Sequence, residues 1–302
     1  MPADASAARA QLLLAAVCFG TSGTAQALGP GGAPTSVGAV RIVVGALLLW
    51  LIARALSGRA GGSAAPGRIA WLAGVGVAAY QLAFFAAVDQ TGVAVGTVVA
   101  IGSGPAAAGL LSRVVNGEPL TGRWAAATAL ACGGIVLLGA GGGSASVDPV
   151  GVGLAVVAGL GYASYTVLAK RMIDAGAAPE RVMSAAFGRG AVILLPVPLL
   201  AGLGWLGSPE GVAVALYLGA VPTALAYFLF ARGLRSLSAG ETATLTLAEP
   251  LTAVLLGALV LGERPGAAAI AGAALVLAGL LVLAAPRGRA APKAVVVAEA
   301  QG

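Results

Sequence analysis

The chain has 302 residues, of which 59% are hydrophobic and only 9% are charged, and its mean hydropathy is +0.97. So little charge over this length excludes a water-soluble globular protein and indicates an integral membrane protein. The net charge of +6 is spread over separate loops, which argues against a nucleic-acid-binding patch.

Apolar stretches of about 20 residues recur along the chain, a length that crosses a bilayer as a helix and is far too long for a barrel strand. The sequence therefore predicts an all-α membrane protein with the lipid bilayer as its surroundings. We expect ten transmembrane helices, at residues 11–29, 35–56, 68–88, 92–112, 123–141, 150–170, 182–203, 210–231, 239–261 and 266–285.

The first expected helix has a competing interpretation. Arg9, the apolar run Leu12–Phe19 and then Ala25-Gln26-Ala27 are similar to a signal peptide with its cleavage site. Cleavage would remove one helix and leave an odd number, so we favour a retained helix.

Polar side chains mark the second and third expected helices. Arg41 lies about 9 Å inside its helix at 1.5 Å per residue. It either extends to the membrane surface or faces the interior, where its guanidinium would receive a substrate carboxylate. Gln81, with Tyr80 beside it, either joins helices or contacts substrate.

The fourth expected helix contains Gly102-Ser103-Gly104-Pro105. Proline has no N–H to donate, so we expect a helix break at Pro105, with Ser103 as a polar candidate beside it. The Gly- and Ser-rich residues 139–149 predict a flexible linker.

The second half has its own intramembrane candidates. Arg189 lies about 12 Å beyond Arg181 along its helix, at a depth similar to that of Arg41 in the first half. Tyr162 and Tyr227 either line a cavity or pack in the core.

Glu249, followed directly by Pro250, stands in the middle of the ninth expected helix. An ionisable group at this depth costs roughly 2.5 kcal/mol or more, which makes it a functional candidate by default. Pro250 should interrupt the helix and free backbone carbonyls beside the carboxylate. The plain alternative is a protonated Glu249 bonded to those carbonyls.

The same pattern occurs 145 residues earlier. Residues 94–118 align without a gap to residues 239–263, with nine of 25 positions identical, and Gly104 stands where Glu249 stands. Five helices per copy is an odd number, so the copies should be inverted, as in many secondary transporters. We expect a first repeat at residues 10–146, a second at 147–286 and a disordered cytoplasmic tail at 287–302.

Basic residues predict the orientation. With the N-terminus in the cytoplasm, 14 of the 17 Lys and Arg residues fall on the cytoplasmic side and one, Arg264, on the outer side. Both termini of this multi-pass protein are therefore expected to be cytoplasmic.

The sequence lacks residues that common catalytic, nucleotide-binding and metal-binding sites require. The chain contains no histidine and no GxxxxGK[ST] loop, and its two cysteines, Cys18 and Cys132, both fall inside expected helices. We therefore expect no enzymatic activity, no cofactor and no metal site.

The stretches GPAAAGLLSRVVNGEPL and AEPLTAVLLGALVLGERP, in two halves of five helices, are similar to the EamA family of the drug/metabolite transporter superfamily. The resemblance covers about residues 10–285 and implies an inner-membrane carrier, often an exporter of amino acids or related metabolites. With Glu249, Arg41 and Arg189 as main candidates, we expect an alternating-access transporter of a small molecule, with protons as a candidate coupling ion. A cationic drug exporter and a non-transporting membrane scaffold are the alternatives.

Overall fold

The computed structural model describes residues 2–56, 67–140 and 148–285, and these are helical with short connections. The long helices are α1 (Pro2–Ala27), α2 (Pro34–Leu56), α3 (Gly67–Val115), α4 (Gly122–Ala140), α5 (Pro149–Asp174), α6 (Pro179–Leu194) and α12 (Ala267–Ala284). The shorter ones are α7 (Pro196–Ala201), η1 (Gly204–Gly207), α8 (Pro209–Gly219), η2 (Ala220–Leu225), α9 (Ala226–Ser236), α10 (Ala239–Leu245), η3 (Thr246–Ala248) and α11 (Glu249–Val260). The expected tail and most of the expected linker lie outside the described residues.

Nine helical stretches of the described chain are long and apolar enough to cross a membrane. They cover Pro34–Leu56, Gly67–Gly92, Val95–Val115, Gly122–Gly139, Pro149–Asp174, Pro179–Ala201, Pro209–Ser236, Ala239–Val260 and Ala267–Ala284. The helix α1 is 26 residues long but is not among the nine.

The expected break at Pro105 was wrong. The third and fourth expected helices are two spans of α3, Gly67–Gly92 and Val95–Val115, which meet at a kink at the non-helical residue Gly92, with φ at +78°. Around Pro105 the backbone stays α-helical. Membrane helices tolerate proline inside a span, whereas Gly92 adopts a positive φ without a side-chain clash.

Prolines do change the helix in the second half. Pro222 has no N–H for the carbonyl of Leu218, four residues earlier, and the Thr223 hydroxyl donates to that carbonyl instead, at 2.8 Å. The chain there forms the π-helix η2, so the expected helix 210–231 is divided among α8, η2 and α9.

The bundle has a basic end, which we define by Arg9, Arg123 and Arg171. Arg9 and Arg123 donate to carbonyls near the end of α12, and Arg171 donates to the last carbonyl of α3. At the opposite end, α2 begins and α7 ends, and the Ser36 hydroxyl donates to the Gly202 carbonyl. The loops between successive spans lie alternately at the basic end and at the opposite end.

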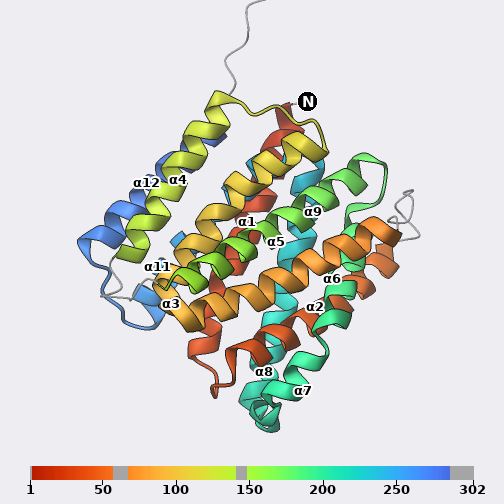
Figure 1. Cartoon of the computed structure of the whole chain (residues 1–302), viewed down its shortest axis with the longest axis vertical. Helices are drawn as coiled ribbons and strands as arrows, with labels where there is room; N and C mark the ends of the chain where they lie inside the picture. The colour runs from red at the N-terminus through yellow and green to blue at the C-terminus, as the bar shows by residue number, and fades with distance from the viewer. Residues whose placement is uncertain (1, 57–66, 141–147, 286–302) are drawn as a thin grey trace, which may run out of the picture.

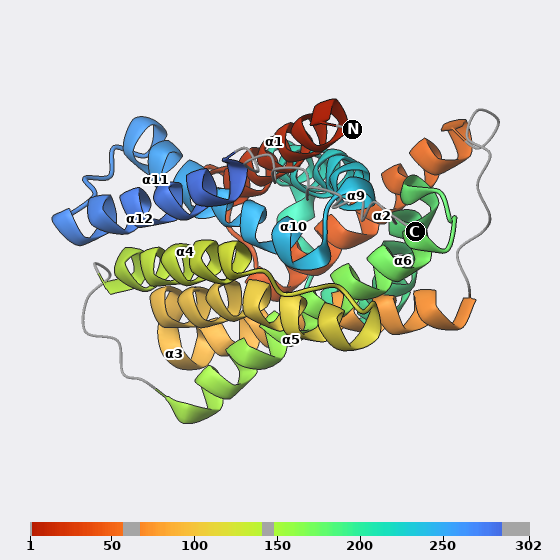
Figure 2. The same ribbon diagram turned by 90° about the horizontal axis from the view of Figure 1, so that it is seen from above.

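Helices α4 and α12 lie side by side at one edge of the molecule in both views (Figures 1 and 2). Gly134 and Gly272 face each other there, since a methyl group added to either would lie 2.6 Å from the carbonyl oxygen of the other. Small residues of this kind allow membrane helices to pack closely. Elsewhere α3 packs along α5, and α1 packs on α9 and α11.

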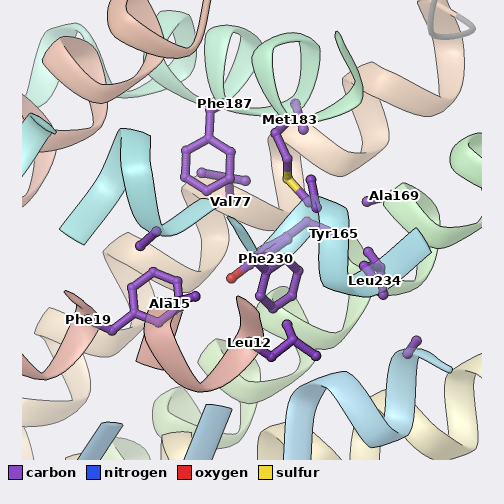
Figure 3. Packing of buried hydrophobic residues seen from close by; sticks show 14 of the residues in the cluster. Leu12, Ala15, Phe19, Val77, Tyr165, Ala169, Met183, Phe187, Phe230 and Leu234 are labelled. Carbon is purple, nitrogen blue, oxygen red and sulfur yellow. The ribbon is translucent and has the colours of Figure 1, made fainter. Parts of the chain in front are cut away.

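The buried core lies where α1, α5, α6 and α9 meet. Phe19, Tyr165, Phe187 and Phe230 converge there from these four helices, with Leu12 beneath them (Figure 3). This packing determines which faces of α1, α5, α6 and α9 point toward the interior of the bundle.

Candidate functional site

Glu249 stands at a change of helix type. The α-helix α10 passes into the 3-10 turn Thr246–Ala248, and α11 then begins at Glu249. Because Pro250 has no N–H for the Thr246 carbonyl, the N–H of Glu249 bonds to that carbonyl instead. The carboxylate is half-buried and accepts no hydrogen bond from the described residues.

Helix α1 approaches the backbone of Glu249 closely at Gly20. A methyl group added to Gly20 would lie 2.5 Å from the Thr252 Cβ atom and 2.7 Å from the Glu249 carbonyl oxygen. These atoms belong to fixed parts of α11, so only glycine fits without a displacement of the helices. Gly20 therefore determines how near α1 lies to Glu249.

We expect Gly20→Ala to lower the free energy of unfolding by about 1–3 kcal/mol, the usual cost of inserting atoms into a packed contact. The thermal unfolding midpoint of the purified protein checks this. Gly23→Ala on the same helix is the matched control, since nothing lies within 4 Å of its added methyl group. An equal effect of both changes would contradict the close contact at Gly20.

Arg41 points from α2 toward α3. Its Nη2 atom donates to the Oε1 atom of Gln81 at 3.2 Å. The side chain of Gln81 is buried, and its Nε2 atom lies against Gly38 of α2, where an added methyl group would be 2.1 Å away. Gln81 thus joins α2 to α3 and orients the guanidinium of Arg41, whose buried Nε atom has no partner among the described residues.

Arg41 and Glu249 form no ion pair in the described part of the chain. Arg41 bonds to Gln81, which is next to Tyr80. The ring of Tyr80 contacts that of Tyr162, whose hydroxyl meets Thr246 at the turn before Glu249. A chain of contacts therefore connects a cation and a carboxylate from opposite halves of the chain.

Four of the five tyrosines of the chain are connected by successive ring contacts in this region. The hydroxyls of Tyr165 and Tyr227 are 2.8 Å apart, and the ring centroids of Tyr80 and Tyr162 are 6.2 Å apart. The hydroxyl of Tyr162 lies 2.9 Å from that of Thr246, at the turn before Glu249.

Phenylalanines extend the aromatic group. Tyr227 lies 4.9 Å from Phe19 and 4.1 Å from Phe187, measured between ring centroids. We did not single out Phe19, Tyr165, Phe187 or Thr246 as site residues from the sequence. An aromatic residue in an apolar helix gives no signal of the face it occupies.

The repeat-related position in α3 has the opposite arrangement. Gly104 corresponds to Glu249, and the Tyr162 ring lies 3.1 Å from where a Gly104 side chain would begin. The nearby Ser103 hydroxyl donates to the Ala100 carbonyl and faces Gly159 of α5. In the second half the backbone of Glu249 lies against a glycine of α1, whereas in the first half Gly104 lies against an aromatic ring of α5.

Arg189 belongs to a different region. Its guanidinium lies 5.6 Å from the ring of Trp71, which is 48% exposed, and its Nη1 atom donates to the Ala185 carbonyl. The structure therefore separates the two intramembrane arginines, which the sequence placed at similar depth.

The candidate site thus joins Arg41, Gln81, Glu249 and the tyrosines. Among the described residues, His, Cys, Asp and Glu side chains form no group of three that could bind a metal ion.

The family model described as the EamA-like transporter family matches residues 9–140 and again residues 149–285. The chain belongs to the EamA-like transporter family. It is 42% identical over 258 residues to the uncharacterised transporter YwfM of Bacillus subtilis, covering 83% of this chain and 85% of that protein. It is also 34% identical over 227 residues to an uncharacterised protein of Pseudomonas aeruginosa, covering 74% of this chain and 75% of the other.

A solved crystal structure, described only as that of a protein, aligns with a TM-score of 0.79 at 20% identity. The alignment covers 91% of this chain and 97% of the other chain. At this identity the likeness concerns the fold alone. EamA-family membership and the apolar helices make the chain a multi-pass membrane transporter.

Proposed function

We propose that this EamA-family protein is a secondary active transporter of the cell membrane that exports amino acids or related small metabolites. Its substrate would bind between Arg41 and Glu249, beside the connected tyrosines. The observation that carries the proposal is a cation and a carboxylate from opposite halves, connected through Gln81 and the rings of Tyr80 and Tyr162, without an ion pair between them among the described residues.

This arrangement suits a zwitterionic solute. Arg41 is held in place by Gln81, and a guanidinium binds a carboxylate through two parallel hydrogen bonds. Glu249 would receive the ammonium group, and the tyrosines would surround the rest of the molecule. Each protein charge would then be neutralised by the substrate, which offsets the cost of keeping both charges inside the membrane.

In the proposed architecture, α1 is a tenth transmembrane helix and both termini are cytoplasmic, so the basic end faces the cytoplasm. Residues 10–146 and 147–286 would form inverted repeats that rock about the site. Two successive matches to the same family model support the repeats, and the distribution of basic residues supports the orientation.

Reporter fusions check this topology. A fusion after residue 302 should report the cytoplasm, and a fusion in the loop near Gly143 should report the outer side, because five helices separate the two halves. A cytoplasmic signal from both fusions would contradict the inverted repeats.

Flux measurements in proteoliposomes check the function itself. We expect zwitterionic amino acids to be moved against their gradient when a proton gradient is imposed. Movement of a lipophilic cation in place of amino acids would instead favour the cationic drug exporter, with Glu249 as counter-charge. No movement of either probe by a folded protein would favour the scaffold.

A further inference from the structure

The two Gly-Glu turns of the repeat have the same backbone form. Gly117 and Gly262 both have φ near +70°, which only glycine adopts readily. The N–H of Glu118 bonds to the Ser112 carbonyl, and the N–H of Glu263 bonds to the Gly257 carbonyl. Each turn ends its helix in the same way and presents one glutamate side chain beside the residue six positions earlier.

The side chain of Glu118 joins the two halves of the chain. Its Oε2 atom accepts a hydrogen bond from the Ser112 hydroxyl at 2.7 Å and from the Ala239 N–H at 3.0 Å. Ser112 lies in the last turn of α3 in the first half, and Ala239 is the first residue of α10 in the second half. Both partners are buried, whereas Glu118 itself is partly exposed.

The surrounding residues close the same end of the bundle. Trp124 of α4 lies between Gly109 of α3 and Gly240 of α10, where added methyl groups would be 2.1 and 2.8 Å from its indole ring. Asn116 fixes the turn further, since its Nδ2 atom donates to both the Ser112 hydroxyl and the Val167 carbonyl. Contacts between helices of both halves thus join the halves at the basic end.

Glu263 has a different environment at the opposite end. It is exposed, and its carboxylate accepts no hydrogen bond from the described residues. It lies over Gly257, where a side chain would begin 2.3 Å from the Oε2 atom. By the offset of 145 residues, Gly257 and Leu261 replace Ser112 and Asn116, so this turn lacks both polar side chains that hold Glu118.

The packing of α10 and α11 also differs between the two ends of the bundle. The segment α10 packs on α3, α4 and α5, whereas α11, the continuation of the same span, packs chiefly on α1. The two related spans, residues 95–115 and 239–260, therefore meet at the basic end and diverge toward the opposite end. The offset pairs Ala239 with Ala94, so the N–H of Ala94 is the partner that symmetry assigns to Glu263.

We infer that Glu118 and Glu263 are alternating positioning residues that hold opposite ends of the transporter closed. In the observed state Glu118 binds the Ala239 amide and closes the basic end. When that end opens, Glu263 binds the Ala94 amide and closes the other end. Since Glu118 alone has polar side chains to hold it, the state closed at the basic end is favoured. This inference rests on the proposed alternating access.

A buried reporter tests the inference. Thr242 of α10 is fully buried, so a cysteine introduced by Thr242→Cys, in a background with Cys18→Ala and Cys132→Ser, should react with a water-soluble maleimide only when the basic end opens. Glu118→Ala removes both hydrogen bonds to a charged acceptor, and we expect the labelling rate to rise about tenfold or more. Ser112→Ala should raise it by a smaller factor.

Glu263→Ala is the matched control and should leave the rate unchanged or lower it. Equal labelling with and without Glu118→Ala would overturn the inference and leave Glu118 as a structural cap. An equal rise in the Glu263→Ala variant would also overturn it, since general loosening would then explain both. If Glu118→Ala fails to fold, Glu118→Gln and Ser112→Ala supply the same comparison.

The labelling is measured on purified protein without substrate. A labelling change in a protein that moves no tested solute would uphold the positioning role and count against the proposed substrate. Flux of amino acids without any labelling change would support the proposed substrate and overturn the positioning role of Glu118.

Discussion

Glu249→Gln is expected to abolish transport against a gradient while leaving the protein folded in the membrane. The amide keeps the size of the side chain and its hydrogen-bonding capacity, but it has no charge and does not titrate. If Glu249 binds a substrate ammonium or carries a proton between the two sides, neither role survives the change. Flux in proteoliposomes, with and without a pH gradient, measures the loss.

The control for this change is Glu210→Gln, at the exposed start of α8 and away from the site. We expect it to transport normally. The thermal unfolding midpoints of both variants should remain near that of the unchanged protein, because the Glu249 carboxylate makes no hydrogen bond to the described residues. Normal flux and an unchanged dependence on pH in Glu249→Gln would remove Glu249 from the mechanism and favour the protonated, structural carboxylate.

The family and the change of helix type at Glu249 could be predicted because their signals are local. A carboxylate within an apolar helix is rare, and the effect of Pro250 on the preceding carbonyl follows from its missing N–H. The spacing of Pro and Gly-Glu in both halves likewise needs no knowledge of the fold.

The partners of these residues could not be predicted, because they depend on packing between distant helices. The sequence predicts similar depths for Arg41 and Arg189, yet one contacts Gln81, 40 residues away, and the other lies over Trp71. Pro105 shares its motif with Pro250, but the irregular residue of α3 is Gly92. Proline removes one hydrogen bond in both places, and the neighbouring helices decide whether the backbone bends there.

The contacts made at glycine positions could not be predicted from the sequence either. Gly20 is one of several small residues in α1, and only the structure shows that its absent side chain lets α11 approach at Glu249. Glu249 and Gly104 are related positions, but Gly20 of α1 contacts the first and Tyr162 of α5 contacts the second, because different helices are their neighbours. The two halves therefore differ around the site, although their Gly-Glu turns have the same backbone form.

Arg41→Lys is expected to weaken substrate binding by about 10- to 100-fold, from the roughly 1.5–3 kcal/mol carried by a hydrogen bond to a charged group. Lysine keeps the positive charge, but a compact ammonium does not reproduce the planar fork of the guanidinium, which donates to Gln81 and would donate to a carboxylate at once. Stabilisation of the purified protein by added amino acid, measured as the shift of its unfolding midpoint, reports the affinity.

Arg189→Lys provides the matched comparison within the membrane. Arg189 lies over the half-exposed Trp71 and donates to the Ala185 carbonyl, and a lysine there keeps its charge and also reaches the membrane surface. We therefore expect its ligand-induced shift and its flux to stay within about twofold of the unchanged protein, consistent with the small effects of exposed charges. If instead Arg189→Lys lost binding and Arg41→Lys kept it, the substrate would have to lie near Trp71, and the site at Glu249 would be wrong.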